Sequence, residues 1–450
     1  MRKRVSTSNK ATSSGNFTNK RRRTKPSQPI GPVQSFSVEG LTHEGKGVAR
    51  AAGKVTFIPG ALPNETVKAQ VVKSNRRFDE AKLIEIEQPS PHRVEPACPH
   101  YVQCGGCSFQ HLALEQQRAA KMNWLQGQLR KVCPEQELTL LADSAFGYRR
   151  RARLSVLVTE QKLNLGFRGK SSQQIVSIDN CLVLTPVLQR AFTTLKSRLS
   201  GNAIADKIGH IELLDDDKGV SVLIRLTANI DDHEQQKWQQ WAQQQPLQLY
   251  WQHADDNRAI VLQQDMRHYQ LNGLTLTYHP QDFIQVNAMM NTKMVAQAME
   301  WLAPNTNDVI LDLFCGVGNF SLPLAQHAKQ VVGVEVQTSM VDSAQTNATA
   351  NGLDNLSFIA ADLTQPATKN LTSLGVTKVL LDPPRAGAFE FLPTLVKLKP
   401  KHILYVSCDA ATMARDAQYL LENRYKVQRG SMMDLFPQTA HLESMLLFSR

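Results

Sequence analysis

The chain has 450 residues, a length typical of about three domains that each bury a core. Hydrophobic residues make up 42% of the sequence and charged residues 20%, which excludes collagen-like, low-complexity and wholly disordered proteins. No apolar stretch reaches the roughly 18 residues that a membrane span needs, and the N-terminus lacks the apolar segment of a secretory signal. We therefore expect a globular, cytoplasmic protein without a membrane partner.

The excess positive charge is concentrated at the N-terminus. Residues 1–30 carry nine basic residues and no acidic one, while the net charge of the whole chain is +11. The rest of this segment is mostly Ser, Thr and Asn, which cannot bury enough surface to offset the entropy of ordering. We expect a disordered basic tail that binds nucleic acid through its phosphates; a tail that only improves solubility is the alternative.

Short alternating segments follow in residues 31–90. TVKAQVVK at 66–73 and AKLIEIEQ at 81–88 alternate apolar and polar residues, and glycines separate the segments before them. This pattern predicts a small β-barrel. GLTHEGKGVAR followed by VTFIPGALPNETV resembles the TRAM domain, an OB-like barrel that binds RNA in several RNA-modifying enzymes. Four prolines at 89–99 predict a linker after the barrel.

Residues 91–275 mix helical and strand patterns, and we expect an α+β central domain. The spacing of apolar residues predicts a helix over 114–132, and residues 148–158 pass from a basic cluster into a strand. Nine glutamines between 233 and 252 favour a solvated surface helix or insertion. The basic cluster either contacts RNA phosphates or forms a solvated face; it consists of Arg149, Arg150, Arg151 and Arg153.

Residues 276–450 alternate between strand and helix patterns. DVILDLF, QVVGVEV, NLSFIAAD, KVLLDPP and HILYVSC are short and rich in Val, Ile and Leu, and turn residues and a helical stretch follow each of them. This alternation predicts an open, mainly parallel, Rossmann-like α/β sheet. Ligands bind beyond the carboxyl ends of the strands in such sheets. The residues that end these strands are therefore the candidate site.

The first strand leads into a glycine-containing turn, DLFCGVGNF. Gly316 and Gly318 allow backbone amides to approach a ligand closely. A dinucleotide-binding site would need a third glycine where Ser321 stands. Glu335 ends the second strand, where a carboxylate can accept both hydroxyls of a ribose; a solvated strand end is the alternative. The combination resembles the S-adenosylmethionine site of Rossmann-like methyltransferases, and Asp362, which ends the third strand, is the expected neighbour of the adenine.

The fourth strand is followed by Asp382, Pro383, Pro384 and Arg385. Amino-group methyltransferases of this fold carry an aromatic residue at the position of Arg385, where it stacks on the flipped base. RNA cytosine-5 methyltransferases place a cysteine directly after a proline in this motif, and LDPPRAG has none. This segment therefore disfavours both classes of methyltransferase.

Cys408 follows the fifth strand, where a thiolate would face the ligand crevice. Carbon 5 of a pyrimidine is too weakly nucleophilic to take a methyl group from a sulfonium unaided, but addition of a thiolate to carbon 6 makes carbon 5 carbanion-like. A base must then remove the proton from carbon 5 so that the thiol can leave, and Glu443 is the candidate. An inert buried thiol is the alternative for Cys408, and we expect Cys315 only to pack.

Five segments together resemble the RNA uracil-5-methyltransferase family over essentially the whole C-terminal domain. They are QVN at 285–287, DLFCGVGNFSLPLA, LDPPRAG, YVSCDAATMARD and HLESM. The resemblance implies that Cys408 is the nucleophile and Glu443 the proton acceptor. It also implies a set of residues that contact S-adenosylmethionine: Gln285, Phe314, Asn319, Glu335, Asp362 and Asp382.

Cys98, Cys104 and Cys107 lie within ten residues, and Cys181 follows much later. Three cysteines so close together in a cytoplasmic chain predict a metal site. Structural zinc stays an alternative, although zinc sites usually show paired short spacings, and Cys133 is a competing fourth ligand. The spacing resembles the 4Fe-4S binding pattern of the uracil-5-methyltransferases that modify 23S ribosomal RNA. This resemblance implies a 4Fe-4S cluster held by Cys98, Cys104, Cys107 and Cys181.

The expected organisation is a basic tail (1–30), a TRAM-like barrel (31–90), a cluster-bearing central domain (91–275) and a methyltransferase domain (276–450). This composition resembles the branch of the family that methylates a uridine of 23S ribosomal RNA, of the uracil-1939 type, to 5-methyluridine. The related tRNA enzyme is expected to lack the barrel and the cluster, so that domain composition would select the target. We expect a monomer that flips its target base.

Three other functions stay open at this point. The first is uridine-5 methylation of tRNA or of another 23S position. The second, from another class, is a non-catalytic RNA-binding or redox-sensing protein built on a methyltransferase fold. A small-molecule methyltransferase is the third, and the barrel and basic tail disfavour it.

Overall fold

The computed structural model of the chain describes residues 31–133, 137–160, 162–253, 260–261, 267–365, 371 and 373–450. The basic segment 1–30, for which we predict disorder, lies outside the described residues. Among the described residues, no helix combines the length and the apolar character needed to cross a membrane.

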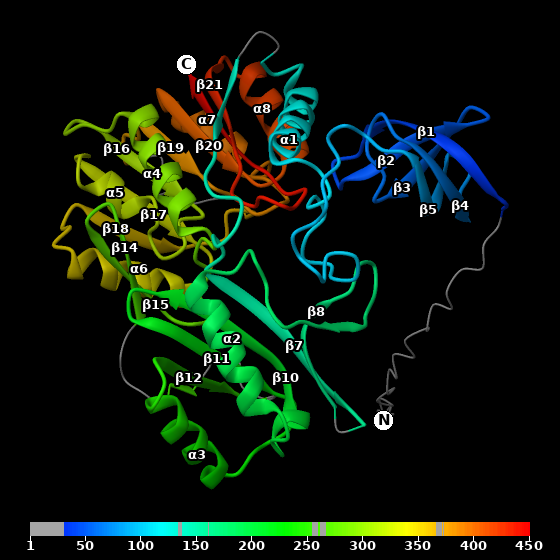
Figure 1. The fold of residues 1–450 in the computed structure, drawn as a ribbon. Helices are drawn as coiled ribbons and strands as arrows, with labels where there is room; N and C mark the ends of the chain where they lie inside the picture. Colours follow the sequence, from blue (N-terminus) through cyan, green and yellow to red (C-terminus); the bar gives the residue numbers. More distant parts are fainter. Residues whose placement is uncertain are drawn as a thin grey trace, which may run out of the picture.

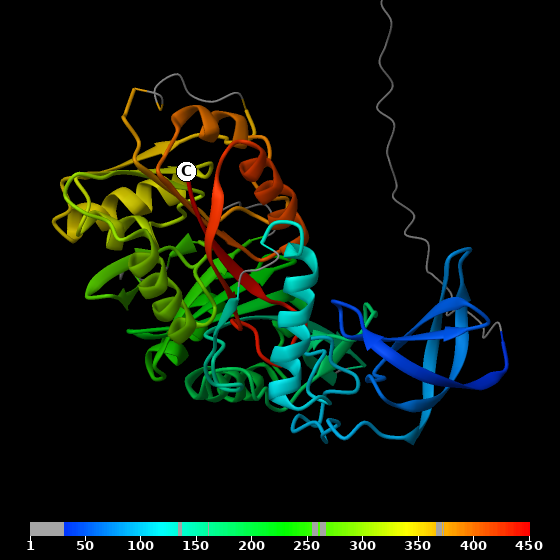
Figure 2. The same cartoon turned by 90° about the horizontal axis from the view of Figure 1, so that it is seen from above.

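A closed five-stranded barrel forms the N-terminal part of the described chain and projects to one side of the molecule (Figures 1 and 2). Its strand order is β1-β2-β3-β5-β4. The alternation in the sequence places Phe36, Val38, Val67 and Ala69 inside the barrel. The predicted small β-barrel is thus confirmed. The strands are β1 (Val33–Leu41), β2 (Lys46–Ala51), β3 (Lys54–Pro59), β4 (Thr66–Ser74) and β5 (Phe78–Gln88).

The central region contains a seven-stranded sheet of order β13-β12-β11-β10-β7-β8-β9. A hairpin of β14 and β15 then leads to the C-terminal part of the chain. The strands are β7 (Arg151–Thr159), β8 (Lys162–Arg168), β9 (Ile175–Ser177), β10 (Ile208–Asp216), β11 (Gly219–Leu226), β12 (Leu247–Gln252), β13 (Ile260–Val261), β14 (Arg267–Leu271) and β15 (Leu274–Tyr278). The helical elements are α2 (Pro186–Leu199), the 3-10 turn η1 (Ala205–Lys207) and α3 (Asp232–Gln243).

The glutamine-rich segment 233–252 differs from the expected surface helix. Its first half is α3, but its second half is β12, a strand in which every residue is buried. The polar residues of β12 have partners inside the protein: Arg267 donates to the Gln248 side chain at 2.9 Å, and Arg225 donates to Gln252. Because these arginines are distant in sequence, the buried strand could not be recognised from its own composition.

An eight-stranded sheet of order β18-β17-β16-β19-β20-β22-β21-β6 forms the C-terminal domain. The five strands from β18 to β20 are parallel and correspond to the five predicted strands, so the predicted α/β sheet is confirmed. The strands are β6 (Leu138–Leu141), β16 (Val309–Leu313), β17 (Gln330–Glu335), β18 (Leu356–Ala360), β19 (Lys378–Leu381), β20 (His402–Ser407), β21 (Lys426–Met433) and β22 (Glu443–Ser449). The helices are α1 (Leu114–Leu129), α4 (Ala288–Leu302), α5 (Ser321–Ala325), α6 (Thr338–Ala350), α7 (Leu392–Leu398) and α8 (Ala410–Glu422).

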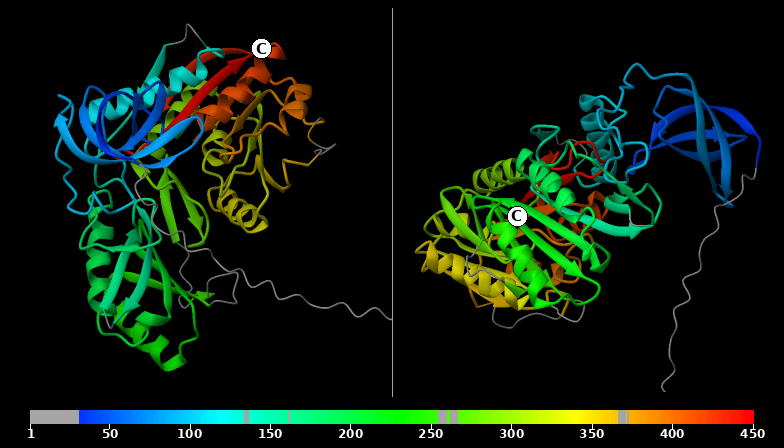
Figure 3. Two further views of the ribbon diagram at one scale, coloured as in Figure 1. Left: turned by 90° about the vertical axis from the view of Figure 1, so that its right-hand side faces the viewer. Right: turned by 60° about the horizontal axis from the view of Figure 1, so that its bottom comes forward.

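Two elements from residues 91–275 belong by their contacts to this C-terminal sheet. The strand β6 pairs in parallel with β21, and the helix α1 packs against α8 with Leu125 and Leu129 in the shared core. The barrel lies beside α1, and the central sheet lies below both in the left view of Figure 3. A ring stack joins the barrel to α1, since His43 lies 4.9 Å from Trp124. The barrel and the C-terminal domain therefore meet at α1.

Candidate active site

The turn after β16 has the backbone geometry of a ligand loop. Phe314, Gly316 and Gly318 all adopt positive φ angles of 63°, 56° and 96°. A side chain at Gly318 would place its Cβ 2.2 Å from Leu322 Cδ1, so only glycine fits. A non-glycine residue in the left-handed region, such as Phe314, is unusual and often marks a functional site. Cys315 is buried in this loop, in agreement with the expected packing role.

Glu335 ends β17 beside this loop. Its Oε1 accepts hydrogen bonds from the backbone N–H groups of Val336 at 2.9 Å and Gln337 at 3.0 Å, and its Oε2 accepts one from Gly316 at 3.3 Å. These bonds fix the carboxylate toward the glycine loop while leaving lone pairs available, because an ionised carboxylate can accept about four hydrogen bonds. The position is suited to a diol such as a ribose.

Two acids, the buried Asp312 and the half-buried Asp382, lie at the carboxyl ends of the neighbouring strands β16 and β19. Burial raises the pKa of Asp312 to about 7 and that of Asp382 to about 6. Ser321 donates to one oxygen of Asp312, whereas the other oxygen, Oδ1, is buried without a partner among the described residues. An orphaned carboxylate oxygen beside a glycine loop fits a cationic, hydrogen-bond-donating ligand. The sequence analysis did not single out Asp312, although it is the first residue of the D-x-F-x-G motif.

The other predicted cofactor residues lie around the same sheet edge. Asn319 forms two amide hydrogen bonds with Asn291, at 2.8 and 2.9 Å, and accepts one from the Tyr269 hydroxyl at 3.3 Å. Asp362 is exposed two residues beyond β18, and hydrogen bonds from Thr364 lower its pKa. Gln285 lies just before α4, where its backbone carbonyl accepts a 2.8 Å hydrogen bond from Arg150.

The predicted contact of the arginine cluster with phosphates is wrong for Arg150 and Arg151. Arg150 is buried and lies 4.5 Å from the centre of the Tyr269 ring. Arg151 donates to the Glu212 carboxylate at 3.0 Å and to the Asp282 carbonyl at 2.5 Å. Both guanidinium groups brace the segment that carries Gln285, because they donate to backbone carbonyls of residues 280–285. Only Arg153 has a largely exposed side chain.

Cys408 and Glu443 lie at the ends of adjacent strands. Cys408 follows β20 directly, and Glu443 is the first residue of β22. These strands pair in antiparallel register with Ser407 opposite Ser444, so Cys408 and Glu443 are the next residues along each strand. Asp409 caps α8 by accepting hydrogen bonds from two backbone N–H groups, which fixes the short turn between β20 and α8. The structure therefore brings the predicted nucleophile and the predicted base together.

The electrostatics of this pair suit proton transfer. Burial, together with the nearby carboxyls of Glu443 and Asp382, raises the pKa of the Cys408 thiol to about 11. Burial also raises the pKa of Glu443 well above its usual value, with Asp382 adding to the effect and Arg385 opposing it. A carboxylate with a raised pKa holds a proton more readily and is a better general base near neutral pH.

One cavity of about 540 Å³ contains Cys408, Glu443 and all four cysteines of the predicted cluster. This volume is within the range of small-molecule sites. Its wall also contains aromatic and basic side chains that the sequence analysis did not identify as site residues: Phe283, Arg385, Phe436 and His441. Phe283 is 63% exposed, so its ring is available for a ligand. The HLESM motif, which contains His441, was the signal that could have revealed part of this wall.

The four cysteines are close enough to influence one another. Burial raises the pKa of Cys107, and the thiols of Cys104 and Cys98 raise it further. Burial likewise raises the pKa of Cys181 to about 12, with Cys107 and Cys104 adding to the shift. The N–H of Gly106 donates to Cys104 Sγ at 3.4 Å, as is common for metal-bound thiolates.

Cys133 is placed elsewhere, since it packs against the core beneath α1. In the part of the chain that the structure describes, no group of three or more His, Cys, Asp or Glu side chains is arranged to hold a single metal ion. A zinc site gathers its sulfurs about 2.3 Å from one ion, whereas a 4Fe-4S cluster binds each cysteine to a different iron and spreads them apart. The four cysteines line one cavity, as the ligands of a 4Fe-4S cluster would.

Comparisons with known proteins identify the family. The sequence matches the tRNA (uracil-5-)-methyltransferase family over residues 113–450 and the TRAM domain over residues 29–84. A 23S rRNA (uracil(1939)-C(5))-methyltransferase RlmD of Marinomonas sp. (strain MWYL1) is 59% identical over 96% of this chain and 99% of its own. The enzyme of the same name from Shewanella sp. (strain ANA-3) is 44% identical over 94% of this chain and 97% of its own.

A solved structure shares the fold. It is the tRNA (uracil-54, C5)-methyltransferase of Pyrococcus abyssi in complex with S-adenosyl-L-homocysteine, with a TM-score of 0.73 and 23% identity, and it covers 92% of this chain and 99% of its own. The expectation that a tRNA enzyme would share only the catalytic part is therefore wrong for this neighbour. Domain composition therefore does not by itself select the target, because a tRNA enzyme shares the fold over 92% of this chain.

Proposed function

The chain belongs to the uracil-5-methyltransferase family, and we propose that it methylates carbon 5 of one uridine in 23S rRNA, of the uracil-1939 type, with S-adenosylmethionine as methyl donor. The placement of Cys408 beside Glu443 at one end of a shared cavity carries this proposal. The names and the 44–59% identities of the rRNA-modifying relatives support the 23S target over tRNA. Such a substrate would place the enzyme in the cytoplasm, where we propose that it acts as a monomer.

The proposed reaction uses two side chains of the chain itself. The Cys408 thiol gives its proton to water, and the thiolate sulfur bonds to carbon 6 of the uracil, so that the electron pair of the 5,6 double bond becomes available at carbon 5. S-adenosylmethionine, when bound, supplies the methyl group that carbon 5 accepts. Glu443 then removes the remaining proton from carbon 5, the double bond re-forms, and the Cys408 thiolate leaves. The uracil must leave its stack to reach Cys408, and we propose base flipping into the cavity.

The donor site is proposed to consist of the residues that surround the glycine loop. Glu335 would bind the ribose hydroxyls, and Asp362 would lie near the adenine. The unpartnered Oδ1 of Asp312 would accept a hydrogen bond from the cationic donor, and Asp382 would add negative charge near it. Gln285, Phe314 and Asn319 would complete the site.

We propose in addition that Cys98, Cys104, Cys107 and Cys181 hold a 4Fe-4S cluster. The expected result is about four irons and four sulfides per chain after anaerobic purification, because each thiolate binds one iron. Cys181→Ser should lower both contents. Cys133→Ser is the matched control and should leave both contents unchanged, since this residue packs outside the cavity. Stoichiometric zinc without sulfide would contradict the proposal.

RNA that contains 5-fluorouracil tests the proposed reaction. Fluorine cannot leave carbon 5 as a proton, so the enzyme should remain covalently bound to the RNA after methyl transfer. With a 23S rRNA fragment we expect a covalent complex that resists denaturation and forms only when S-adenosylmethionine is present. Mass spectrometry should show that the bound base is methylated. A tRNA T-arm of the same length is the control for the target. Preferential trapping of the tRNA would contradict the rRNA assignment, and trapping of neither RNA would contradict the reaction.

A further inference from the structure

The loop of residues 434–442 connects β21 to β22 and leads directly to Glu443. Met433 pairs with Glu443 across these strands. Asp434 therefore begins the loop at its base, and Glu443 follows its other end. The loop also forms part of the wall around Cys408, through Phe436, Thr439, His441 and Leu442.

Residues from distant parts of the chain hold the backbone of this loop. Each carbonyl oxygen from residue 435 to residue 438 accepts a hydrogen bond from outside the loop. The donors, in that order, are Asn287 Nδ2 at 3.1 Å, Lys121 Nζ at 3.0 Å, the Tyr148 hydroxyl at 3.0 Å, and the backbone N–H groups of Ser108 and Phe109 at 3.0 Å. None of these donors belongs to β21 or β22, so the strands alone do not determine the loop conformation.

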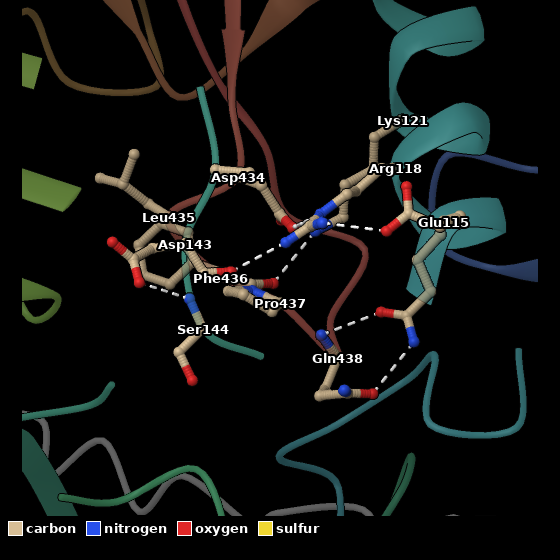
Figure 4. Close-up of polar contacts among 12 residues, drawn as sticks. Glu115, Arg118, Lys121, Asp143, Ser144, Asp434, Leu435, Phe436, Pro437 and Gln438 are labelled. Atoms are coloured by element: carbon tan, nitrogen blue, oxygen red, sulfur yellow. Dashed lines mark hydrogen bonds and ion pairs between the residues drawn. The ribbon is translucent and has the colours of Figure 1, made fainter. Parts of the chain in front are cut away.

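A buried ion pair anchors the beginning of the loop. Lys121 Nζ lies 2.7 Å from Asp434 Oδ1, and the two side chains are 2% and 1% exposed. Arg118 reaches the other carboxylate oxygen at 3.3 Å. Because Lys121 also donates to the Phe436 carbonyl, one ammonium group ties Asp434 to the middle of the loop (Figure 4). Such a pair is strongly directional where water is excluded.

A second contact from α1 holds the far side of the loop. The Gln117 side chain donates to Gln438 Oε1 at 3.0 Å and accepts from the Gln438 backbone N–H at 3.0 Å. Gln438 has a φ of 67°, a left-handed conformation that a non-glycine residue keeps only when its surroundings support it. The helix α1 also packs against α8, which begins just after Cys408. One helix thus braces the segments that carry both reactive side chains.

From these contacts we propose that Lys121 and Asp434 are positioning residues that hold Glu443 in place for removal of the carbon 5 proton. This inference rests on the proposed function. Cys408 is held by β20 and by the cap of α8. Glu443 begins β22 and pairs with Met433, but the chain that leads into it is the loop, so the contacts that hold the loop also fix the start of this strand. Loosening the loop should therefore slow proton removal more than it slows attack by the thiolate. A purely structural role would affect both steps alike.

The test is a single-turnover experiment with Lys121→Met, saturating 23S rRNA fragment and S-adenosylmethionine. Formation and decay of the covalent complex are followed by denaturing gel electrophoresis. We expect formation within about threefold of the wild-type rate and decay slowed by about tenfold or more, since a displaced general base loses much of its contribution. Lys121→Arg retains the charge and should restore decay in large part.

Lys378→Met is the matched control. Lys378 forms a comparably buried 2.7 Å ion pair with Asp308 at the amino-terminal edge of the same sheet, far along the strands from Glu443. Both rates of this variant should stay near wild type. If Lys121→Met does not fold, Lys121→Met combined with Asp434→Leu replaces the pair without leaving a buried charge alone. Equal slowing of both steps, or no slowing of either, would overturn the positioning role, whereas absence of any complex in the wild type would refute the proposed function instead.

Discussion

Replacement of Cys408 by serine is expected to reduce methylation of the rRNA by more than about 10³-fold, the scale on which loss of a nucleophile usually acts. A serine hydroxyl occupies the same place but is a far weaker nucleophile than a thiolate, so it cannot prepare carbon 5 for methyl transfer. The measurement is transfer of a labelled methyl group to a 23S rRNA fragment. Denaturing gels should show no covalent complex with RNA that contains 5-fluorouracil.

Two controls separate this loss from misfolding. Binding of S-adenosylmethionine to Cys408→Ser should stay close to wild type, because the glycine loop and Glu335 lie on other strands. Cys133→Ser removes a half-buried thiol outside the cavity and should keep full activity. Near-normal turnover by Cys408→Ser would refute the covalent mechanism, because it would show that the reaction does not need this thiol.

Glu443→Gln is expected to trap the enzyme on natural RNA that contains no fluorine. Glutamine has the size of glutamate but cannot accept the carbon 5 proton, so the thiolate cannot leave after methyl transfer. Release of the product should slow by about 10²- to 10⁴-fold, the usual contribution of a general base. The measurement is a methylated covalent complex that resists denaturation and accumulates with time.

The double variant Glu443→Gln with Cys408→Ser should form no complex, which would identify the bonded sulfur. A trapped complex in this double variant would mean that another residue is the nucleophile. Wild-type turnover by Glu443→Gln would mean that another group removes the proton. Asp382, whose pKa is raised to about 6 by burial, would then be the next candidate.

Local sequence patterns predicted much of the fold. Alternation of apolar residues predicted the barrel, and five short apolar runs predicted the parallel strands from β16 to β20. Both predictions were possible because the pattern of a strand depends on residues that are close in sequence. Cys408 was correctly placed at the end of a strand for the same reason. The motif DLFCGVGNF predicted a glycine loop, and the structure places three positive φ angles there.

Other features could not be predicted from the sequence because they depend on residues that are distant along the chain. Leu247–Gln252 is a buried strand only because arginines elsewhere satisfy its glutamines. The buried Arg150 and the half-buried Arg151 bind other parts of the protein and not phosphates, because Tyr269, Gln285 and Glu212 surround them. Leu138–Leu141 joins the C-terminal sheet by pairing with a strand almost 300 positions later. No local pattern contains such information.

The amino-acid sequence alone thus determined which residues have the chemistry for the reaction, where the strands of the barrel and of the parallel sheet run, and to which family the chain is similar. Tertiary structure decided that Glu443 stands beside Cys408, that four cysteines share their cavity, and that Lys121 and Asp434 fasten the loop between them. The physical reason is that periodicity and turn chemistry act over a few residues, whereas burial, ion pairing and strand register depend on segments that meet only when the chain is folded.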